Sequence, residues 1–281
     1  MVKIVVDSGS DISAQEAKEL GIVMVPIEIQ FGDDVFYDGV DLMPSEFYEK
    51  LVNCKELPTT SLINEYRWTE TFEDVVKEGD EVLAIVLSSG LSGTFNCAKE
   101  AASKFDGKVF VVDSLSATLG ERVLVQVAMK MVQEGKSAKE IAEILDEKKS
   151  KLHIYAMIDT LKYLKKGGRI SSTTAFFGEL LSIKPIAGVV DGKVQMLGKE
   201  KGMKNVHKTM CSFVEKDGGI DFSLPYGLLW TGNDKSLLDK FVANCSHLWS
   251  EDSETIQQHM MGSTIGTHIG PGAFGIVYFE K

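Results

Sequence analysis

Short apolar runs alternate with amphipathic helical patterns through the first half of the chain. Residues 81–87 form a continuous apolar run, which is typical of a strand buried on both faces of a parallel sheet. Strands are predicted at residues 3–6, 22–31, 81–87 and 108–113, with an acidic turn region at 33–41. Helices are predicted at residues 14–20, 44–52, 66–77 and 92–105, followed by two more up to about residue 149. This alternation indicates a doubly wound parallel sheet with helices on both faces.

The pattern changes after residue 150. A strand is predicted at 152–158, and the last strand of the chain at 274–279. Helices are predicted at 160–166 and 171–181, and the first of them ends at Gly167-Gly168. Strands at 183–190 and 193–197 flank Asp191-Gly192, a strong signal for a two-residue hairpin turn. The sequence therefore predicts a two-lobed α/β protein. A parallel-sheet lobe is expected over residues 1–150, and an α+β lobe with a mixed sheet over residues 151–281.

Charge is distributed unevenly between these two halves. The formal net charge is −11, with −13 on residues 1–150 and +2 on residues 151–281. Residues 161–208 alone carry +7. The acidic balance argues against general nucleic-acid binding. The basic segment is either a solvated face or a docking surface for an anionic ligand or acidic partner, because a field of one sign steers association.

Several classes of protein are not expected from this sequence. The first residues lack the pattern of a secretory signal, and no uncharged apolar run reaches the roughly 18 residues of a membrane span, so we expect a cytoplasmic protein. The histidines are dispersed and the cysteines widely spaced, which favours buried free thiols over a disulfide or a metal site. The four cysteines are Cys54, Cys97, Cys211 and Cys245. No P-loop motif is present, so no ATP site is expected.

Three loops of the first half place serine and glycine residues between an apolar strand and a helix. They cover residues 7–11, 88–94 and 113–116. Because loops at the carboxyl ends of parallel strands converge on one edge of a sheet, we expect a ligand site there. Ser92 stands at an expected helix N-cap, where free N–H groups favour an anion. The alternative is that these serines only cap helices.

Three further segments combine hydroxyl, basic or glycine residues. Pro58-Thr59-Thr60-Ser61 precedes a helix, and a simple helix cap is the alternative interpretation. Lys166-Gly167-Gly168-Arg169-Ile170 is a basic turn. Residues 266–272 are expected to form a loop in which glycines allow close backbone approach around His268. A structural role for this histidine is the alternative to a functional one.

In their order and spacing, these motifs resemble those of the DegV family, the fatty-acid-binding subunits of bacterial fatty-acid kinase. The resemblance runs essentially end to end and rests on Ile4-Val5-Val6-Asp7-Ser8, Pro58-Thr59-Thr60-Ser61, Ser88-Ser89-Gly90-Leu91-Ser92-Gly93-Thr94, Leu164-Lys165-Lys166-Gly167-Gly168-Arg169-Ile170, Lys184-Pro185-Ile186 and His268-Ile269-Gly270-Pro271-Gly272. It implies one long-chain fatty acid buried between the lobes, with its carboxylate held by Thr60 and Ser92. Further candidates near the head group or the partner surface are Ser61, Ser89, Arg169 and His268. Candidates for lining the tail, or alternatively ordinary core residues, are Phe176, Phe177, Leu180 and Leu181.

The resemblance also implies a partner protein. The chain would be a lipid-binding carrier rather than an enzyme, with no cofactor and at most transient membrane contact. It would present the fatty-acid carboxylate to a separate ATP-binding kinase subunit for phosphorylation to an acyl-phosphate. We expect the basic segment, and in it Lys199, Lys201 and Lys204, to form a docking surface for that kinase or for nucleotide phosphates.

Two departures from the family pattern concern recognition. Thr60-Ser61-Leu62-Ile63 stands where the family usually has Thr-Ser-Gln-Pro, so the polar contacts of that loop are expected to differ. Lys199-Glu200-Lys201-Gly202 stands where the family often has Lys-x-Arg. Lysine provides charge without the planar two-pronged contact of arginine, so partner affinity or identity is expected to differ as well.

Two other functions are compatible with the same residues. A serine esterase or acyl hydrolase would use Ser92 and His268 with Asp7 or Asp113 as a triad. Against this, Ser92 misses the G-x-S-x-G elbow by one position. The second alternative is a regulatory or interaction protein with an incidental lipid, whose partner binding would survive removal of the lipid.

Overall fold

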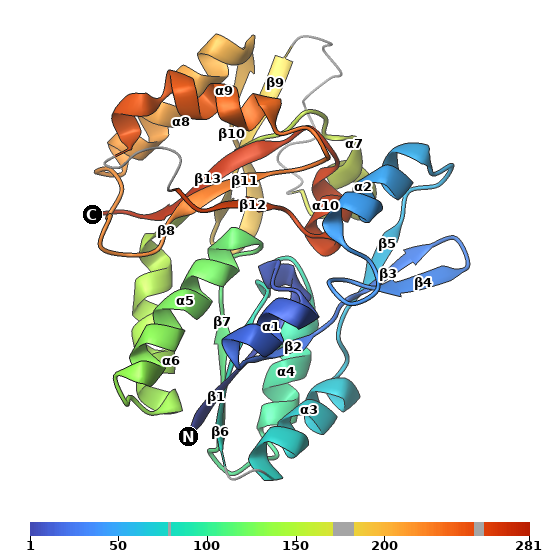
Figure 1. Cartoon of the computed structure of the whole chain (residues 1–281), viewed down its shortest axis with the longest axis vertical. Helices are drawn as coiled ribbons and strands as arrows, with labels where there is room; N and C mark the ends of the chain where they lie inside the picture. Colours follow the sequence, from blue (N-terminus) through green and yellow to red (C-terminus); the bar gives the residue numbers. More distant parts are fainter. Residues whose placement is uncertain (78–79, 171–182, 250–255) are drawn as a thin grey trace.

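The first half of the chain folds around a parallel sheet (Figure 1). In this computed structural model, which describes residues 1–77, 80–170, 183–249 and 256–281, the strand order is β2-β1-β6-β7. The strands are β1 (Val2–Asp7), β2 (Val23–Val25), β6 (Glu81–Val86) and β7 (Val109–Asp113). Along β6, Leu83 and Ile85 face one core cluster, and Val82 and Ala84 face another. Both faces of the strand are therefore buried, as its unbroken apolar run predicts.

Helices cover both faces of this sheet, which confirms the doubly wound prediction. Those on one face are α1 (Ala14–Leu20), α5 (Leu119–Gln133) and α6 (Ala138–Lys148), and those on the other are α3 (Glu65–Lys77) and α4 (Thr94–Ala102). α6 begins with a capping box between Ser137 and Glu140, which satisfies two backbone N–H groups at the helix start. In the described ranges, no helix is long and apolar enough to cross a membrane.

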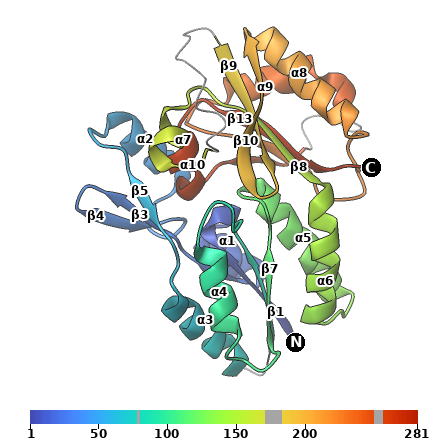
Figure 2. The ribbon, with the colours of Figure 1, turned by 180° about the vertical axis from the view of Figure 1, so that it is seen from behind.

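A mixed sheet of order β10-β9-β8-β13-β11-β12 forms the second half, as predicted (Figures 1 and 2). Its strands are β8 (Leu152–Met157), β9 (Ile183–Val190), β10 (Lys193–Lys201), β11 (Gly227–Trp230), β12 (Gln258–Met260) and β13 (Phe274–Phe279). One face packs under α8 (Met203–Lys216) and α9 (Ser236–Asn244). The other face, through residues such as Ile154, Ala187 and Val277, shares a core cluster with α5. The two sheets therefore meet across a common apolar layer.

The predicted hairpin joins β9 and β10. Asp191 and Gly192 both have positive φ angles, 49° and 73°, which is the backbone conformation that a two-residue hairpin turn requires. β10 runs on to Lys201, beyond the predicted end at residue 197, with a register shift between Met196 and Gly198. The predicted domain boundary falls at η2 (Lys149–Lys151), between α6 and β8. The predicted helix at 171–181 lies outside the described residues.

A small antiparallel sheet of order β4-β3-β5 lies beside the parallel sheet and was not predicted as a unit. It consists of β3 (Glu28–Phe31), β4 (Asp34–Tyr37) and β5 (Thr59–Ser61). The prediction of a turn region over 33–41 was wrong in part, because β-forming side chains at 35–37 pair with β3 after a tight turn at Gly32. Next to this sheet lie α2 (Pro44–Asn53), α7 (Lys162–Gly167) and α10 (Ser263–Ile269). The short helix η1 (Ser8–Ser10) follows β1, and η4 (Ser246–Leu248) follows α9.

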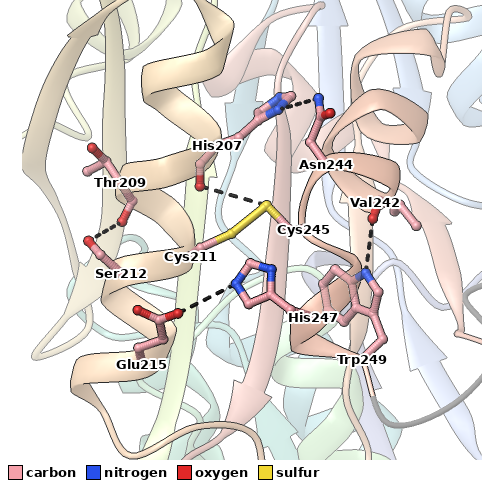
Figure 3. Close-up of a disulfide and its surroundings, with 10 residues drawn as sticks. All are labelled: His207, Thr209, Cys211, Ser212, Glu215, Val242, Asn244, Cys245, His247 and Trp249. Atoms are coloured by element: carbon pink, nitrogen blue, oxygen red, sulfur yellow. Dashed lines mark hydrogen bonds and ion pairs between the residues drawn. A yellow bond between two sulfur atoms is a disulfide. The ribbon is translucent and has the colours of Figure 1, made fainter.

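The prediction that the cysteines are buried free thiols was wrong for two of the four. Cys211 on α8 and Cys245 at the end of α9 form a disulfide (Figure 3). The two helices lie side by side on the mixed sheet, and the side chains of His207 and Asn244 also connect them, through a hydrogen bond of 3.1 Å. A sequence separation of 34 residues contains no motif from which this pairing could be read. Cys54 and Cys97 are free and half-buried.

Candidate functional site

An apolar cavity lies where the carboxyl edge of the parallel sheet faces the mixed sheet. The space between its lining residues is about 870 Å³, which includes space open to solvent. The parallel-sheet side contributes Leu87 and Leu91 from the loop after β6, and Ala117 from the loop after β7. The mixed-sheet wall consists mainly of Ile154, Ala156, Ile158, Ala187, Gly188, Val189 and Val194. The loops that were expected to meet at the edge of the parallel sheet therefore lie opposite an apolar wall.

Thr60 and His268 form a polar contact in the wall of this cavity. Thr60 Oγ1, on β5, lies 2.9 Å from His268 Nε2, on α10, and both residues line the cavity. Burial lowers the pKa of His268 to about 4, and the nearby charge of Arg169 acts in the same direction. The imidazole is therefore neutral near pH 7. Its buried Nδ1 has no hydrogen-bond partner among the described residues.

The structure places His268 in a helix, so the prediction of a loop at this position was wrong. α10 runs from Ser263 to Ile269, with Gly266 in its interior. A side chain at 266 would meet Phe47 Cε1 at 2.6 Å and Tyr48 Oη at 2.7 Å. The glycine that suggested a loop is therefore needed for close packing of α10 on α2.

Ser92 lies in the cavity wall next to the β5 loop. Its Oγ is 2.9 Å from Thr94 Oγ1 and accepts the N–H of Thr94 at 3.2 Å. Thr94 Oγ1 also accepts the N–H of Ile63 at 3.2 Å, which ties the loop after β6 to the loop after β5. The N-cap of α4 is Gly93 rather than Ser92, so the Ser92 hydroxyl lies just outside the helix.

Arg169 completes the polar part of the lining. Its Nε donates to the carbonyl of Leu91 at 3.2 Å, and its Nη1 donates to the carbonyl of Gly167 at 2.7 Å. The ring of His268 lies against Gly167, where an added Cβ would come within 2.2 Å of Nδ1. The guanidinium is thus held by two carbonyls, that of Leu91, which precedes Ser92, and that of Gly167, which lies against His268.

The other sequence candidates have different positions. Ser61 lines the cavity, whereas Ser89 is exposed and uses its backbone N–H to bond Asp113. Lys199, Lys201 and Lys204 are exposed on β10 and at the start of α8. The tail-lining candidates Phe176, Phe177, Leu180 and Leu181 lie outside the described residues.

Among the described residues, the contacts of the alternative triad do not assemble a serine hydrolase. Asp7 accepts the N–H groups of Gly9 and Leu87, and Asp113 accepts those of Ser89 and Leu115. His268 bonds to Thr60 through Nε2, and no described acid reaches its Nδ1. A triad requires an acid on one ring nitrogen and the serine on the other.

Asp7, Asp38 and Glu121 are buried carboxyl groups outside the cavity lining. Asp7 was a candidate for the alternative triad, whereas the sequence did not single out Asp38 or Glu121. Asp7 is fully buried, and desolvation raises its pKa to about 7 against the effect of its two backbone hydrogen bonds. Glu121, on α5, is also fully buried, and neither of its carboxyl oxygens has a hydrogen-bond partner in the described ranges. Burial raises the pKa of Glu121 well above its ordinary value, which favours the protonated form of this side chain. Asp38 is buried beneath α10.

Fold and site together define an α/β protein with an apolar cavity between a parallel and a mixed sheet. The family model described as "Uncharacterised protein, DegV family" matches residues 1–281, and the chain belongs to this family. A DegV domain-containing protein of Caldanaerobacter subterraneus subsp. tengcongensis is 36% identical, over 100% of this chain and 99% of the relative.

Solved structures of the family have the same fold. A fatty-acid-binding DegV family protein from Thermus thermophilus is 28% identical, with a TM-score of 0.87 over 100% of this chain and 99% of the other. DegV from Bacillus subtilis, a fatty-acid-binding protein, is 28% identical, with a TM-score of 0.82 and the same coverage. A stearic-acid-binding protein from Eubacterium ventriosum is 26% identical, with a TM-score of 0.84 and again the same coverage.

Proposed function

We propose that this chain binds one long-chain fatty acid in the cavity between the two sheets. The acyl tail lies against the apolar wall, and the carboxylate lies near Thr60 and Ser92. The observation that carries the proposal is an apolar cavity with hydroxyls, a neutral imidazole and one guanidinium gathered in its lining. The fatty-acid-binding relatives from Thermus thermophilus and Bacillus subtilis, which match over the whole chain, support it.

The tail and the carboxylate contribute differently to the free energy of binding. Burying about fourteen methylene groups of a sixteen-carbon tail contributes roughly 11 kcal/mol before the cost of association. Binding in the sub-micromolar range, about −8 kcal/mol or stronger, is compatible with this figure. A carboxylate in a closed cavity must be hydrogen-bonded, or its burial becomes prohibitive. The tail therefore supplies affinity, and the polar residues fix the orientation.

The neutral state of His268 suits this role. With a proton on Nε2, the imidazole donates to Thr60 Oγ1, which leaves the Thr60 hydroxyl proton free to donate to the carboxylate. Ser92 Oγ accepts from the backbone of Thr94, and its own proton is available to the ligand when the Thr94 hydroxyl is the donor in the contact between the two side chains. Neutral donors at both positions bind the carboxylate without a second buried charge.

We propose further that the bound carboxylate is presented to a separate kinase subunit. A carboxylate oxygen attacks the γ-phosphorus of ATP held by that subunit, a new P–O bond forms, and ADP leaves. The product is an acyl-phosphate bound to this chain. In this proposal Arg169, which donates to the carbonyl next to Ser92, interacts with the added phosphoryl group.

The exposed lysines at 199, 201 and 204 form the proposed kinase-docking surface. The hairpin turn of β10 lies against the loop after β6, because Ser88 Oγ donates to the carbonyl of Gly192 at 2.7 Å. Lys199 is seven residues further along the strand, roughly 23 Å at the rise of an extended chain. A kinase that docks on these lysines must therefore be large enough to reach both this surface and the head group.

Native mass spectrometry of the purified chain tests lipid binding. We expect one fatty-acid adduct per chain, and full reloading of the delipidated chain by one equivalent of palmitate. A chain that takes up no fatty acid, or many equivalents without saturation, would contradict the proposal.

Charge reversal tests the docking surface separately. Replacing Lys199, Lys201 and Lys204 with glutamate should slow phosphorylation by the kinase at least about tenfold, because like charges at a rim slow association. Palmitate binding should stay unchanged. Replacing Lys18, Lys130 and Lys139, which are exposed in the parallel-sheet half, with glutamate is the control with the same change in net charge. Equal effects of the two triple variants would contradict the proposed docking surface.

A further inference from the structure

The first turn of α10 is held by two aspartates from the opposite end of the chain. Asp38 Oδ1 accepts the N–H of Ser263 at 3.1 Å, and its Oδ2 accepts both the N–H and the hydroxyl of Thr264, at 3.1 and 2.6 Å. Asp11 Oδ1 accepts the N–H of Gly262 at 2.9 Å. The Asp38 contacts join residues about 225 positions apart in the sequence. The position of the helix that carries His268 is therefore fixed by contacts with the first forty residues of the chain.

This helix has no cap from its own sequence. The N-cap residue is Gly262, which provides no side chain to bond the first turn. A Cβ at this position would lie 2.8 Å from Asp11 Oδ1, so the glycine is required for the close approach of that aspartate. A local serine or aspartate cap would stabilise the helix alone. The distant Asp38 also fixes where the helix lies.

α10 is closely packed along its side as well. Gly266 lies against Phe47 and Tyr48 of α2, and Tyr48 Oη donates to the carbonyl of Met261 at 3.2 Å. With this packing the helix behaves as a short rigid rod. Thr264 and His268 are four residues apart, about 6 Å along the axis and on one face. A displacement of the first turn is therefore transmitted to His268.

Asp38 adjoins the small sheet that contains Thr60. Asp38 directly follows β4, and its N–H donates to the carbonyl of Ile27 at 3.0 Å. β3 lies between β4 and β5, with Ile29 paired to Thr60. The sheet β4-β3-β5 thus contacts α10 twice, through Asp38 at the start of the helix and through Thr60 at His268.

We propose that Asp38 is a positioning residue of the head-group site, which fixes α10 so that His268 stays in hydrogen-bond contact with Thr60. The inference rests on the proposed function, because the head group is the fatty-acid carboxylate. Asp38 is 2% exposed, so water does not replace a donor or acceptor lost there. Thr264, which donates to Asp38, also lines the cavity.

Asp38→Asn tests this role with almost no change in shape. The amide keeps one acceptor oxygen but places an NH₂ group against a donor of the first turn. We expect the dissociation constant for palmitate to rise about tenfold or more, which corresponds to the loss of one or two buried hydrogen bonds. Asp34→Asn, an exposed aspartate of the same hairpin, is the matched control and should bind like the wild type.

A double-mutant cycle separates positioning from general stability. If Asp38 acts through His268, Asp38→Asn should change palmitate binding less than about twofold when His268→Gln is already present. A full tenfold effect on that background, or wild-type binding by Asp38→Asn alone, would overturn the proposal. Thr264→Val, which removes only the hydroxyl donor, replaces Asp38→Asn in the cycle if the latter does not fold.

The NMR signals of the His268 ring distinguish failure of this inference from failure of the proposed function. A wild-type chain that takes up no palmitate contradicts the proposed function. In that case the inference is still decided by the ring: its signals should shift in Asp38→Asn and stay unchanged in Asp34→Asn. Unchanged His268 signals in Asp38→Asn would exclude a positioning role whatever the ligand.

Discussion

The two halves of the molecule bury different kinds of side chain around one cavity. The parallel-sheet half buries carboxyl groups near the cavity, among them Asp7, Asp38 and Glu121. The mixed sheet presents an apolar wall, with residues such as Ile154 and Ala187. Polar groups on loops form directional hydrogen bonds, whereas the apolar face of a sheet provides contact area that does not depend on direction.

The polar residues of the lining come from both halves, Thr60 and Ser92 from the first and Arg169 and His268 from the second, whereas the mixed sheet supplies much of the apolar wall. We expect the polar residues to determine the orientation of the ligand and the apolar wall to determine its affinity.

The largest expected effect on palmitate binding comes from removing the hydroxyl groups of Thr60 and Ser92. Thr60→Ala combined with Ser92→Ala should weaken palmitate binding by at least about a hundredfold, because each hydrogen bond to a charged group contributes about 1.5–3 kcal/mol. The circular dichroism spectrum should stay unchanged. Isothermal titration calorimetry of the delipidated variant measures the loss.

The pair Thr59→Ala and Ser89→Ala is the control for that variant. Both side chains are exposed, and neither lines the cavity, although each is close in sequence to a residue that does. Equal losses in both double variants would show that the hydroxyls of the lining have no special role, and the comparison of the two halves would then fail.

The mixed-sheet half is held by a covalent cross-link between α8 and α9. A disulfide that closes a loop of 34 residues lowers the conformational entropy of the unfolded chain, which stabilises the folded chain by about 4 kcal/mol. Reduction, or replacement of Cys211 and Cys245 by serine, should lower the free energy of unfolding in guanidinium by that order. The denatured, unreduced chain should titrate as two free thiols, from Cys54 and Cys97. Four titratable thiols without reductant would contradict the pairing.

A smaller effect is expected from the buried carboxyl of the other half. Glu121 ionises near its ordinary pKa of 4.5 in the unfolded chain, whereas burial keeps it protonated to much higher pH in the folded chain. The wild type therefore loses stability as the pH rises above 4.5, and a neutral side chain does not. Glu121→Gln should therefore be more stable than the wild type at pH 8.

Urea unfolding at two pH values checks this sign. The advantage of Glu121→Gln should disappear at pH 4, where the carboxyl is protonated in both the folded and unfolded chains. Glu143→Gln, on exposed α6, should show no such dependence on pH. A Glu121→Gln variant less stable than the wild type at pH 8 would mean that the buried carboxyl has a partner that requires its charge.

Features with a local signal were predictable from the sequence. The Asp191-Gly192 turn, the stop of α7 at Gly168 and the buried run of β6 follow from φ preferences and from hydrophobic pattern. The convergence of Ser92 on the carboxyl edge of the sheet followed from topology alone. These rules need only neighbouring residues or a known strand order.

Features that depend on distant contacts were not predictable. Gly266 suggested a loop, because its packing against Phe47 is visible only in three dimensions. The segment around Thr60 suggested a helix cap, because its partner strand β3 lies thirty residues earlier. The pairing of Cys211 with Cys245 likewise has no local signal.

A crystal structure of the chain purified with palmitate tests the central claim most directly. The account predicts continuous density for one acyl chain along Ile154 and Ala187, with its carboxylate within hydrogen-bond distance of Thr60 and Ser92. A cavity filled by protein side chains, or a fatty acid bound with its carboxylate away from both hydroxyls, would contradict it.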